Sequence, residues 1–154
     1  MNKNMKPNEI LFSNSAFFAD MARMLSDGMD VTFRAKGSSM LPFIVEGRDS
    51  IVVRQVQRLD VGDIVLARVP GKGYVLHRIY RVNGERLVLM GDGNLCATEQ
   101  CCKTDVLGKA VKILRNGQSV DCYSLAERRK AATWRTLLPI RRCLLFAYKL
   151  FCGL

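Results

Sequence analysis

Gly37-Ser38-Ser39-Met40-Leu41-Pro42 is the stretch that decides how this chain is interpreted, together with Val75-Leu76-His77-Arg78-Ile79. The first segment places a glycine and a serine before Met-x-Pro, an unusual composition for a turn between strands. The second carries the single histidine of the protein on a strand-like run. A serine becomes a nucleophile when a neighbouring base removes its proton, and imidazole suits this task because its ordinary pKa is about 6.5. The pattern predicts that Ser39 and His77 act as a nucleophile and its general base.

Short strands are predicted on both sides of these two segments. Polar and apolar residues alternate, and Gly, Asn and Asp interrupt the runs, which is typical of a compact β domain. Asn83-Gly84 is a two-residue hairpin signal, and Asn116-Gly117 predicts a second turn. One amphipathic helix is expected before the strands, over residues 15–26, with Gly28 as its stop. The predicted strands cover residues 31–35, 50–54, 64–68, 74–82, 86–90 and 109–115.

The C-terminal tail has a different periodicity. Ser124-Leu125-Ala126-Glu127 is a capping-box pattern that predicts a helix over residues 125–138, and Pro139 separates it from a second amphipathic piece at 141–151. The tail is rich in apolar side chains and in positive charge. Two interpretations stay open: the tail lies on an anionic membrane surface, or it packs on the domain with its arginines facing water.

Composition places the chain among globular proteins. It has 154 residues, 49% of them hydrophobic, which is enough for one domain with a real core. The net charge of +10 is uneven, because the tail from Glu127 onward holds seven of the 24 Lys and Arg residues but one of the 14 Asp and Glu residues. The body is therefore only mildly basic, and nucleic acid is not expected as a partner.

No metal or other cofactor is expected. The six cysteines include the cluster Cys96-x4-Cys101-Cys102, which has neither a paired CxxC nor a nearby histidine, whereas structural zinc favours tighter ligand pairs. No signal peptide and no apolar run of 18 or more residues is visible. We therefore expect free thiols and a cytoplasmic location, with the tail as a candidate peripheral membrane anchor.

Five blocks of the chain resemble the signal peptidase and LexA-like clan of serine peptidases, Ser-His branch. The resemblance covers most of the body, and the blocks occur in the same order. They are Gly37-x-Ser39-Met40-x-Pro42, Val61-Gly62-Asp63-Ile64-Val65, His77-Arg78, Gly91-Asp92-x-Asn94 and Val106-Leu107-Gly108-Lys109-Ala110. The resemblance implies a mainly β fold, a coiled β-sheet domain with a short N-terminal helix and an α-helical tail.

The resemblance also implies roles for individual residues. The serine before Met-x-Pro is the nucleophile of the clan, which corresponds to Ser39 rather than Ser38. Many members use lysine as the base, but the position before Arg78 is histidine here, as in the endoplasmic-reticulum and spore-former signal peptidases. Asp92 corresponds to the aspartate that assists the histidine in that branch. Backbone groups of the turn are expected to bind the oxyanion or the substrate, and these candidates are Gly37, Ser38, Met40 and Pro42.

The sequence therefore predicts a serine endopeptidase that cleaves a protein or leader peptide. The expected organisation is an N-terminal helical segment (1–29), a peptidase domain (30–123) and a basic amphipathic helical tail (124–154). Two alternative functions are compatible with parts of the sequence. A LexA-like regulator that cleaves itself would need a DNA-binding region, and one helix before Val31 is too little for a helix-turn-helix. The other alternative is a non-catalytic β domain that docks on a membrane or an acidic partner through its tail.

Overall fold

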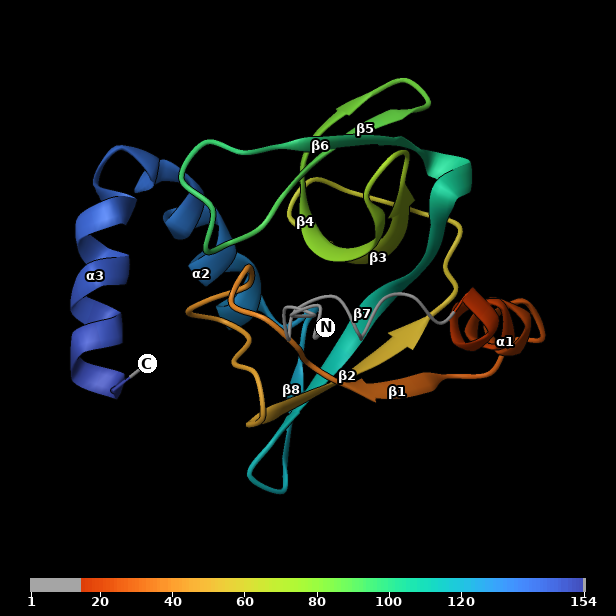
Figure 1. Ribbon diagram of the computed structural model, residues 1–154, viewed down its shortest axis with the longest axis horizontal. Helices are drawn as coiled ribbons and strands as arrows, with labels where there is room; N and C mark the ends of the chain where they lie inside the picture. Colours follow the sequence, from red (N-terminus) through yellow and green to blue (C-terminus); the bar gives the residue numbers. More distant parts are fainter. Residues whose placement is uncertain (1–14, 154) are drawn as a thin grey trace, which may run out of the picture.

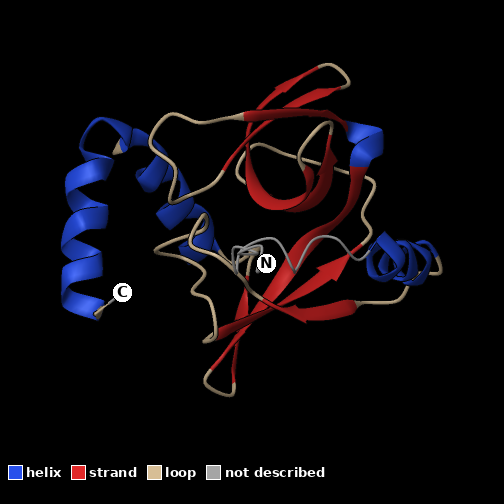
Figure 2. Ribbon diagram, in the orientation of Figure 1, coloured by secondary structure: helices blue, strands red, loops and turns tan. Residues whose placement is uncertain are grey.

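The computed structural model describes residues 15–153 and shows one curled antiparallel sheet with a helix at one end and two helices at the other (Figures 1 and 2). The strands follow the order β1-β2-β7-β3-β4-β5-β6, and β8 pairs with β7. The mainly β fold with a short N-terminal helix and a helical tail is confirmed. The expected segment 1–29 is described only from residue 15, because its first 14 residues lie outside the described part of the chain.

The elements agree closely with the sequence patterns, with two strands added. The helices are α1 (Ser15–Ser26), α2 (Leu125–Thr136) and α3 (Arg141–Cys152), with short 3-10 turns η1 (Lys103–Asp105) and η2 (Leu138–Ile140). The strands are β1 (Val31–Arg34), β2 (Asp49–Arg54), β3 (Ile64–Val69), β4 (Gly73–Asn83), β5 (Arg86–Met90), β6 (Glu99–Cys102), β7 (Val106–Arg115) and β8 (Gln118–Asp121). β6 and β8 were not among the predicted strands, although β8 directly follows the turn predicted at Asn116-Gly117.

The core has two main parts because the central strand β3 buries both of its faces. Ile64 and Leu66 contribute to one cluster, which also receives Phe18 from α1. Val65 and Ala67 contribute to the other, which β4, β5 and β6 complete. Successive side chains of a strand point to opposite faces, so an uninterrupted apolar run fits a strand covered on both sides. This arrangement places β4, which carries His77, in the middle of the packed sheet.

Two buried ion pairs join the blocks on which the family resemblance rests. Asp63 of the Val-Gly-Asp block accepts a 2.8 Å hydrogen bond from Nζ of Lys109, which belongs to the block in β7. Arg78 donates to the Gly62 carbonyl oxygen at 2.7 Å and to the carboxylate of Asp92. Removing one partner of such a buried pair typically destabilises a protein by about 3–5 kcal/mol. These ion pairs therefore hold together sequence blocks that lie far apart in the chain.

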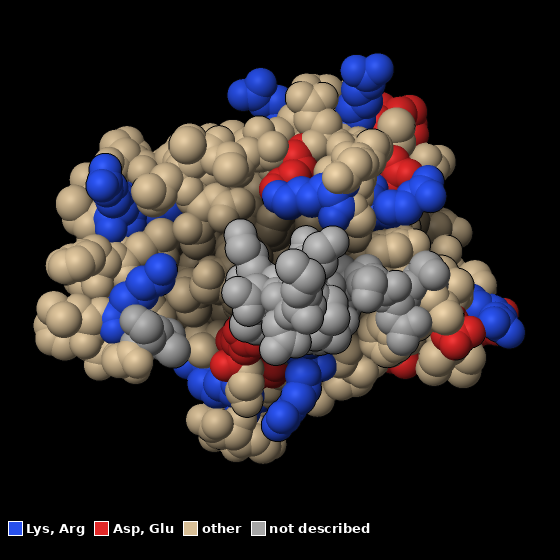
Figure 3. Space-filling model, in the orientation of Figure 1, with Lys and Arg blue, Asp and Glu red and all other residues tan. Residues whose placement is uncertain are grey.

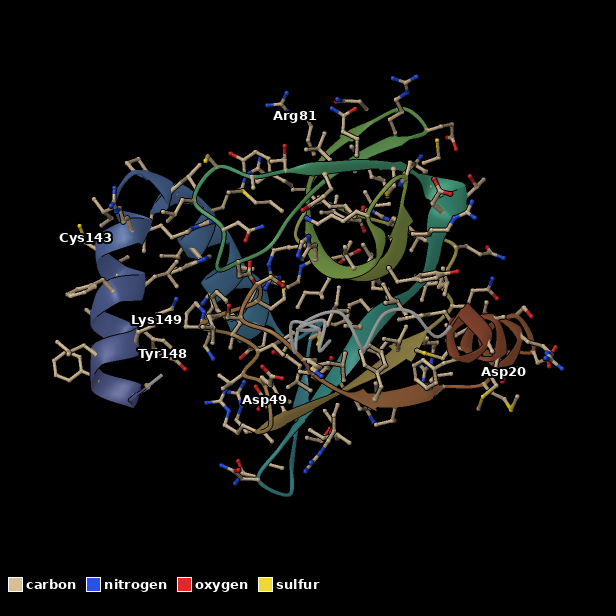
Figure 4. The ribbon with its side chains drawn as sticks, in the orientation of Figure 1. Asp20, Asp49, Arg81, Cys143, Tyr148 and Lys149 are labelled. Carbon is tan, nitrogen blue, oxygen red and sulfur yellow. The ribbon has the colours of Figure 1, made fainter. Side chains whose placement is uncertain are left out.

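A third carboxylate closes the loop that follows the serine turn. Asp49 is 1% exposed and accepts hydrogen bonds from Arg48, from Arg115 and from the backbone N–H of Val45 (Figure 4). Burial alone would raise the pKa of Asp49, but these hydrogen bonds lower it to about 2. The carboxylate is ionised at neutral pH and holds the two ends of loop 43–49 together.

The tail helices pack on the domain through one side and leave the other side open. Leu145 of α3 is buried against Leu41 and Val45, close to the serine turn. Phe146 and Leu150 of the same helix are 72% and 70% exposed. None of the helices within residues 15–153 combines the length and the apolar content that a membrane crossing requires.

Candidate active site

The serine turn connects β1 to the buried segment that leads into loop 43–49. Gly37 has a φ of +80°, a backbone conformation that glycine adopts without steric penalty. The turn then brings Met40 into the core, where it is 4% exposed, while Ser39 stays half-buried at the surface of a pocket. The turn is closed by a 3.2 Å hydrogen bond from the Leu41 N–H to the Ser38 carbonyl oxygen, so Ser39 and Met40 are its central residues.

This pocket has a volume of about 730 Å³ and brings together the predicted nucleophile and base. Ser39 from the turn and His77 from β4 both line it, although they are far apart in the sequence. Gly37, Ser38 and Met40 line it as well, whereas Pro42 does not. No hydrogen bond joins the Ser39 hydroxyl to the imidazole within the described residues, but catalytic hydrogen bonds are often long before substrate binds.

His77 has a carboxylate partner that the sequence analysis missed. Its Nδ1 lies 2.8 Å from Oε2 of Glu99, and the side chains of these two residues are 5% and 6% exposed. The other carboxylate oxygen of Glu99 is paired with Nζ of Lys72 at the pocket edge. Lys72 therefore holds Glu99, Glu99 contacts Nδ1, and Nε2 remains as the nitrogen available to the serine.

Burial and hydrogen bonding set the protonation states of His77 and Glu99. Burial lowers the pKa of His77, and the neighbouring Glu99 carboxylate opposes that effect only in part. Burial alone would raise the pKa of Glu99, but hydrogen bonds from Lys72 and His77 lower it overall. At neutral pH the imidazole is therefore neutral and able to accept a proton, while Glu99 is ionised.

The structure does not bring Asp92 to the imidazole, and this corrects the sequence-based expectation. Its carboxylate accepts two hydrogen bonds from the Arg78 guanidinium, at 2.8 and 2.6 Å. His77 and Arg78 are adjacent in β4, so their side chains leave the strand on opposite faces. Asp92 and Arg78 line a second cavity, of about 450 Å³, whereas His77 lines the pocket of the serine.

The Gly91-Asp92-Gly93-Asn94 loop instead supports the serine turn. The N–H of Gly93 donates a 2.8 Å hydrogen bond to the Ser39 carbonyl oxygen. A Cβ atom at Gly91 would lie 2.4 Å from that same oxygen, and one at Gly93 would lie 2.6 Å from the Ser38 carbonyl oxygen. Both glycines are therefore required for the close approach of the two backbones.

The tail helices hold the same loop from the other side. Nε1 of Trp134 donates to the Asp92 carbonyl oxygen at 2.8 Å, and Nη1 of Arg141 donates to the Asn94 carbonyl oxygen at 3.0 Å. The loop thus lies between the serine turn and the tail. The packing of α2 and α3 is therefore connected to Ser39 through these two side-chain hydrogen bonds and the backbone hydrogen bond from Gly93 to Ser39.

The serine turn contains two backbone donors that are available to a substrate. Within the described residues, the backbone N–H groups of Ser39 and Met40 have no hydrogen-bond acceptor, so both can bind an oxyanion.

No cluster of three or more His, Cys, Asp or Glu side chains in residues 15–153 is arranged to hold a metal ion. All six cysteines are free thiols.

Comparison with known proteins gives one family. The family model described as Peptidase S24-like matches residues 7–111, a span that contains the serine turn, His77 and Glu99 and ends within β7. Comparison with curated proteins gave no match.

Proposed function

Because the chain belongs to the Peptidase S24-like family, we propose that it is a serine endopeptidase in which Ser39 is the nucleophile and His77 the general base. Glu99 is proposed as the residue that orients the imidazole, the role that the sequence assigned to Asp92. One observation carries the proposal: a buried, neutral imidazole has a carboxylate on Nδ1 and shares a pocket with the serine of the predicted turn.

The proposed reaction follows from these positions. Nε2 of His77 accepts the hydroxyl proton as Oγ of Ser39 attacks the carbonyl carbon of the scissile peptide bond. The carbonyl oxygen becomes negative and is stabilised by the free N–H groups of Ser39 and Met40. The carbon–nitrogen bond then breaks, and the imidazolium gives its proton to the leaving amine. A water molecule, deprotonated by the same imidazole, hydrolyses the acyl-enzyme and regenerates Ser39.

Covalent labelling tests the proposal without knowledge of the natural substrate. A fluorophosphonate reacts with a serine only when a base activates its hydroxyl, and peptide mapping by mass spectrometry then locates the label. We expect the label on Ser39 in the wild type and in Ser38→Ala, and no label in Ser39→Ala or His77→Ala. A label on Ser38, or equal labelling of the wild type and His77→Ala, would contradict the proposed roles.

We propose, as a second function, that the outer face of α3 attaches the protein to an anionic membrane surface. Phe146, Leu150 and Phe151 are 72%, 70% and 88% exposed, an unusual density of bare apolar side chains on one helix. The helix also carries the exposed Arg142, which lies one turn before Phe146. Apolar side chains that insert beside basic ones are typical of helices that lie in a lipid headgroup layer.

Vesicle co-sedimentation tests the attachment. We expect the protein to sediment with vesicles that contain phosphatidylglycerol and to stay in solution with neutral phosphatidylcholine vesicles. The double variant Phe146→Ser, Leu150→Ser is expected to lose binding. The matched variant Met29→Ser, Leu95→Ser, which replaces exposed apolar residues elsewhere, is expected to keep it. Equal sedimentation of both variants would exclude α3 as the attachment site.

A further inference from the structure

The described residues that line the Ser39 pocket include basic side chains but no acidic ones. Among its described lining residues there are four Lys and Arg residues, and there is no Asp or Glu. They are Arg34, Lys36, Lys72 and Lys149. They come from three parts of the fold: the end of β1, the turn between β3 and β4, and α3. The pocket is therefore surrounded by positive charge on more than one side.

Three of these four cations are not neutralised by a neighbouring carboxylate. Lys72 is paired with Glu99, but Arg34, Lys36 and Lys149 have no ion pair within residues 15–153. Most acidic side chains elsewhere are paired with a basic one, and Figure 3 shows the visible acidic groups beside basic groups. Unpaired cations around a low-dielectric hollow focus a positive potential on whatever enters it.

The inner wall of the same pocket is apolar. Phe33, Leu66 and Leu76 line it, and so does Tyr74, whose ring stacks on Phe18 with 4.1 Å between ring centroids. Binding of an apolar side chain against such walls is favourable by about 25 cal/mol for each Å² of apolar surface removed from water. The pocket thus combines an apolar floor with a basic rim.

We infer that the peptidase acts on extended peptide segments in which large apolar side chains stand next to acidic residues. The inference rests on the proposed function, since it assigns the substrate class of the Ser39 pocket. Lys36 lies three positions before Ser39 in the sequence, and Figure 4 shows Lys149 on the side of α3 that faces the rest of the domain. Acidic side chains near the scissile bond would therefore meet a cation from the turn or from the tail.

A peptide is favoured over a nucleic acid as the anionic ligand. The backbone of a nucleic acid carries no apolar side chains that the apolar wall of the pocket could cover. Phosphate-directed binding depends on cations that follow a path along the surface, with aromatic side chains on which bases stack. Here the ring of Tyr74 is already stacked on Phe18, and the three unpaired cations surround one pocket.

Binding to a Ser39→Ala variant tests the inference separately from catalysis. The probe is a fluorescein-labelled decapeptide in which leucine and alanine alternate with glutamate. The control peptide has glutamine at every glutamate position. Fluorescence anisotropy is expected to give a dissociation constant about tenfold lower for the acidic peptide, and the difference should shrink at high salt. Failure of fluorophosphonate labelling in the wild type would defeat the proposed catalysis but leave this comparison intact.

Two triple variants in the same background identify the cations. The change Arg34→Gln, Lys36→Gln, Lys149→Gln is expected to abolish the preference for the acidic peptide. The control change Arg81→Gln, Arg86→Gln, Lys112→Gln removes the same charge from exposed residues outside the pocket and is expected to preserve it. Equal binding of the acidic and amide peptides, no binding of either, or tighter binding of an oligothymidylate than of the acidic peptide would overturn the inference.

Discussion

Replacing Glu99 by glutamine is expected to remove most of the proposed activity, although the side chain keeps its size. In the wild type, one carboxylate oxygen accepts from Nδ1 of His77 and the other is paired with Lys72. Glutamine offers only one oxygen, and the charged Lys72 is expected to take it. The amide NH₂ then faces the imidazole and donates to Nδ1. The ring proton moves to Nε2, the nitrogen that must accept the serine proton.

The size of this effect follows from the tautomer. An imidazole with the wrong tautomer beside its serine lowers kcat by as much as about 10⁴-fold in the Ser-His-Asp triad. Lys72 is half-exposed, so its hold on the amide oxygen is incomplete, and we expect a loss on the order of 10³-fold. Adding Lys72→Met to Glu99→Gln frees that oxygen for Nδ1 and is expected to restore a large part of the activity.

The assay uses the fact that His77 is the single histidine of the chain. A proton–nitrogen correlation spectrum of the imidazole therefore reports one tautomer without assignment, and fluorophosphonate labelling gives the matching rate. We expect the proton on Nδ1 in the wild type, on Nε2 in Glu99→Gln, and on Nδ1 again in the double variant. A Glu99→Gln variant that labels within about threefold of the wild-type rate, with its tautomer unchanged, would refute the reasoning.

Three further predictions concern the loop and the base. Asp92→Asn leaves the Arg78 guanidinium without its buried carboxylate, so we expect about 3 kcal/mol less stability and a Tm lower by roughly 6–12 °C in a thermal melt. Gly93→Ala places a Cβ 2.6 Å from the Ser38 carbonyl oxygen, and the displaced turn should lower the labelling rate roughly 100-fold in a protein that still folds. Burial lowers the pKa of His77 below 6.5, so the labelling rate should be constant above pH 6.5 and fall at lower pH. Folding stability should also decrease below pH 6.5, because the unfolded chain binds a proton at His77 more readily than the folded protein does. A midpoint of the labelling rate above pH 6.5 would contradict the assignment of His77 as the base.

Local patterns predicted the serine turn and most of the elements because they depend on short stretches of chain. Gly37 and Met-x-Pro specify the turn around Ser39 within six residues. The Ser124 cap is also local, and its hydroxyl accepts from the Glu127 N–H at 3.3 Å as the capping pattern predicted. Alternation in residues 74–82 correctly placed His77 on a strand, which the structure extends from Gly73 to Asn83.

Glu99 was missed because its role depends on a pairing that no short stretch specifies. Residues 99–102 form β6 only by pairing with β5, where Leu89 is opposite Glu99 and Leu87 is opposite Cys101. Of this segment, the sequence patterns led only to an interpretation of the cysteines, as a candidate metal site. One signal was present: Glu99 and Cys101 alternate with Gln100 and Cys102, and the structure buries the first two. Alternation alone does not say that the buried face ends beside a histidine.

The Asp92 expectation failed for a reason that the sequence contains. An aspartate that follows β5 can turn toward either face of β4, and the two adjacent residues His77 and Arg78 offer opposite faces. A permanently charged guanidinium with two parallel donors binds a carboxylate more strongly than a neutral imidazole does. The structure shows that outcome, with both Asp92 oxygens on Arg78.

The contacts of Trp134 and Arg141 with the loop at 91–94 determine which fragment of the protein should be expressed. The family match ends at residue 111, and a fragment trimmed to that border would look complete by homology. It would lack both side chains that brace the loop against the serine turn. The match to the family therefore ends before the segments that support the candidate site, and fragments for labelling experiments or crystallisation should keep α2 and α3.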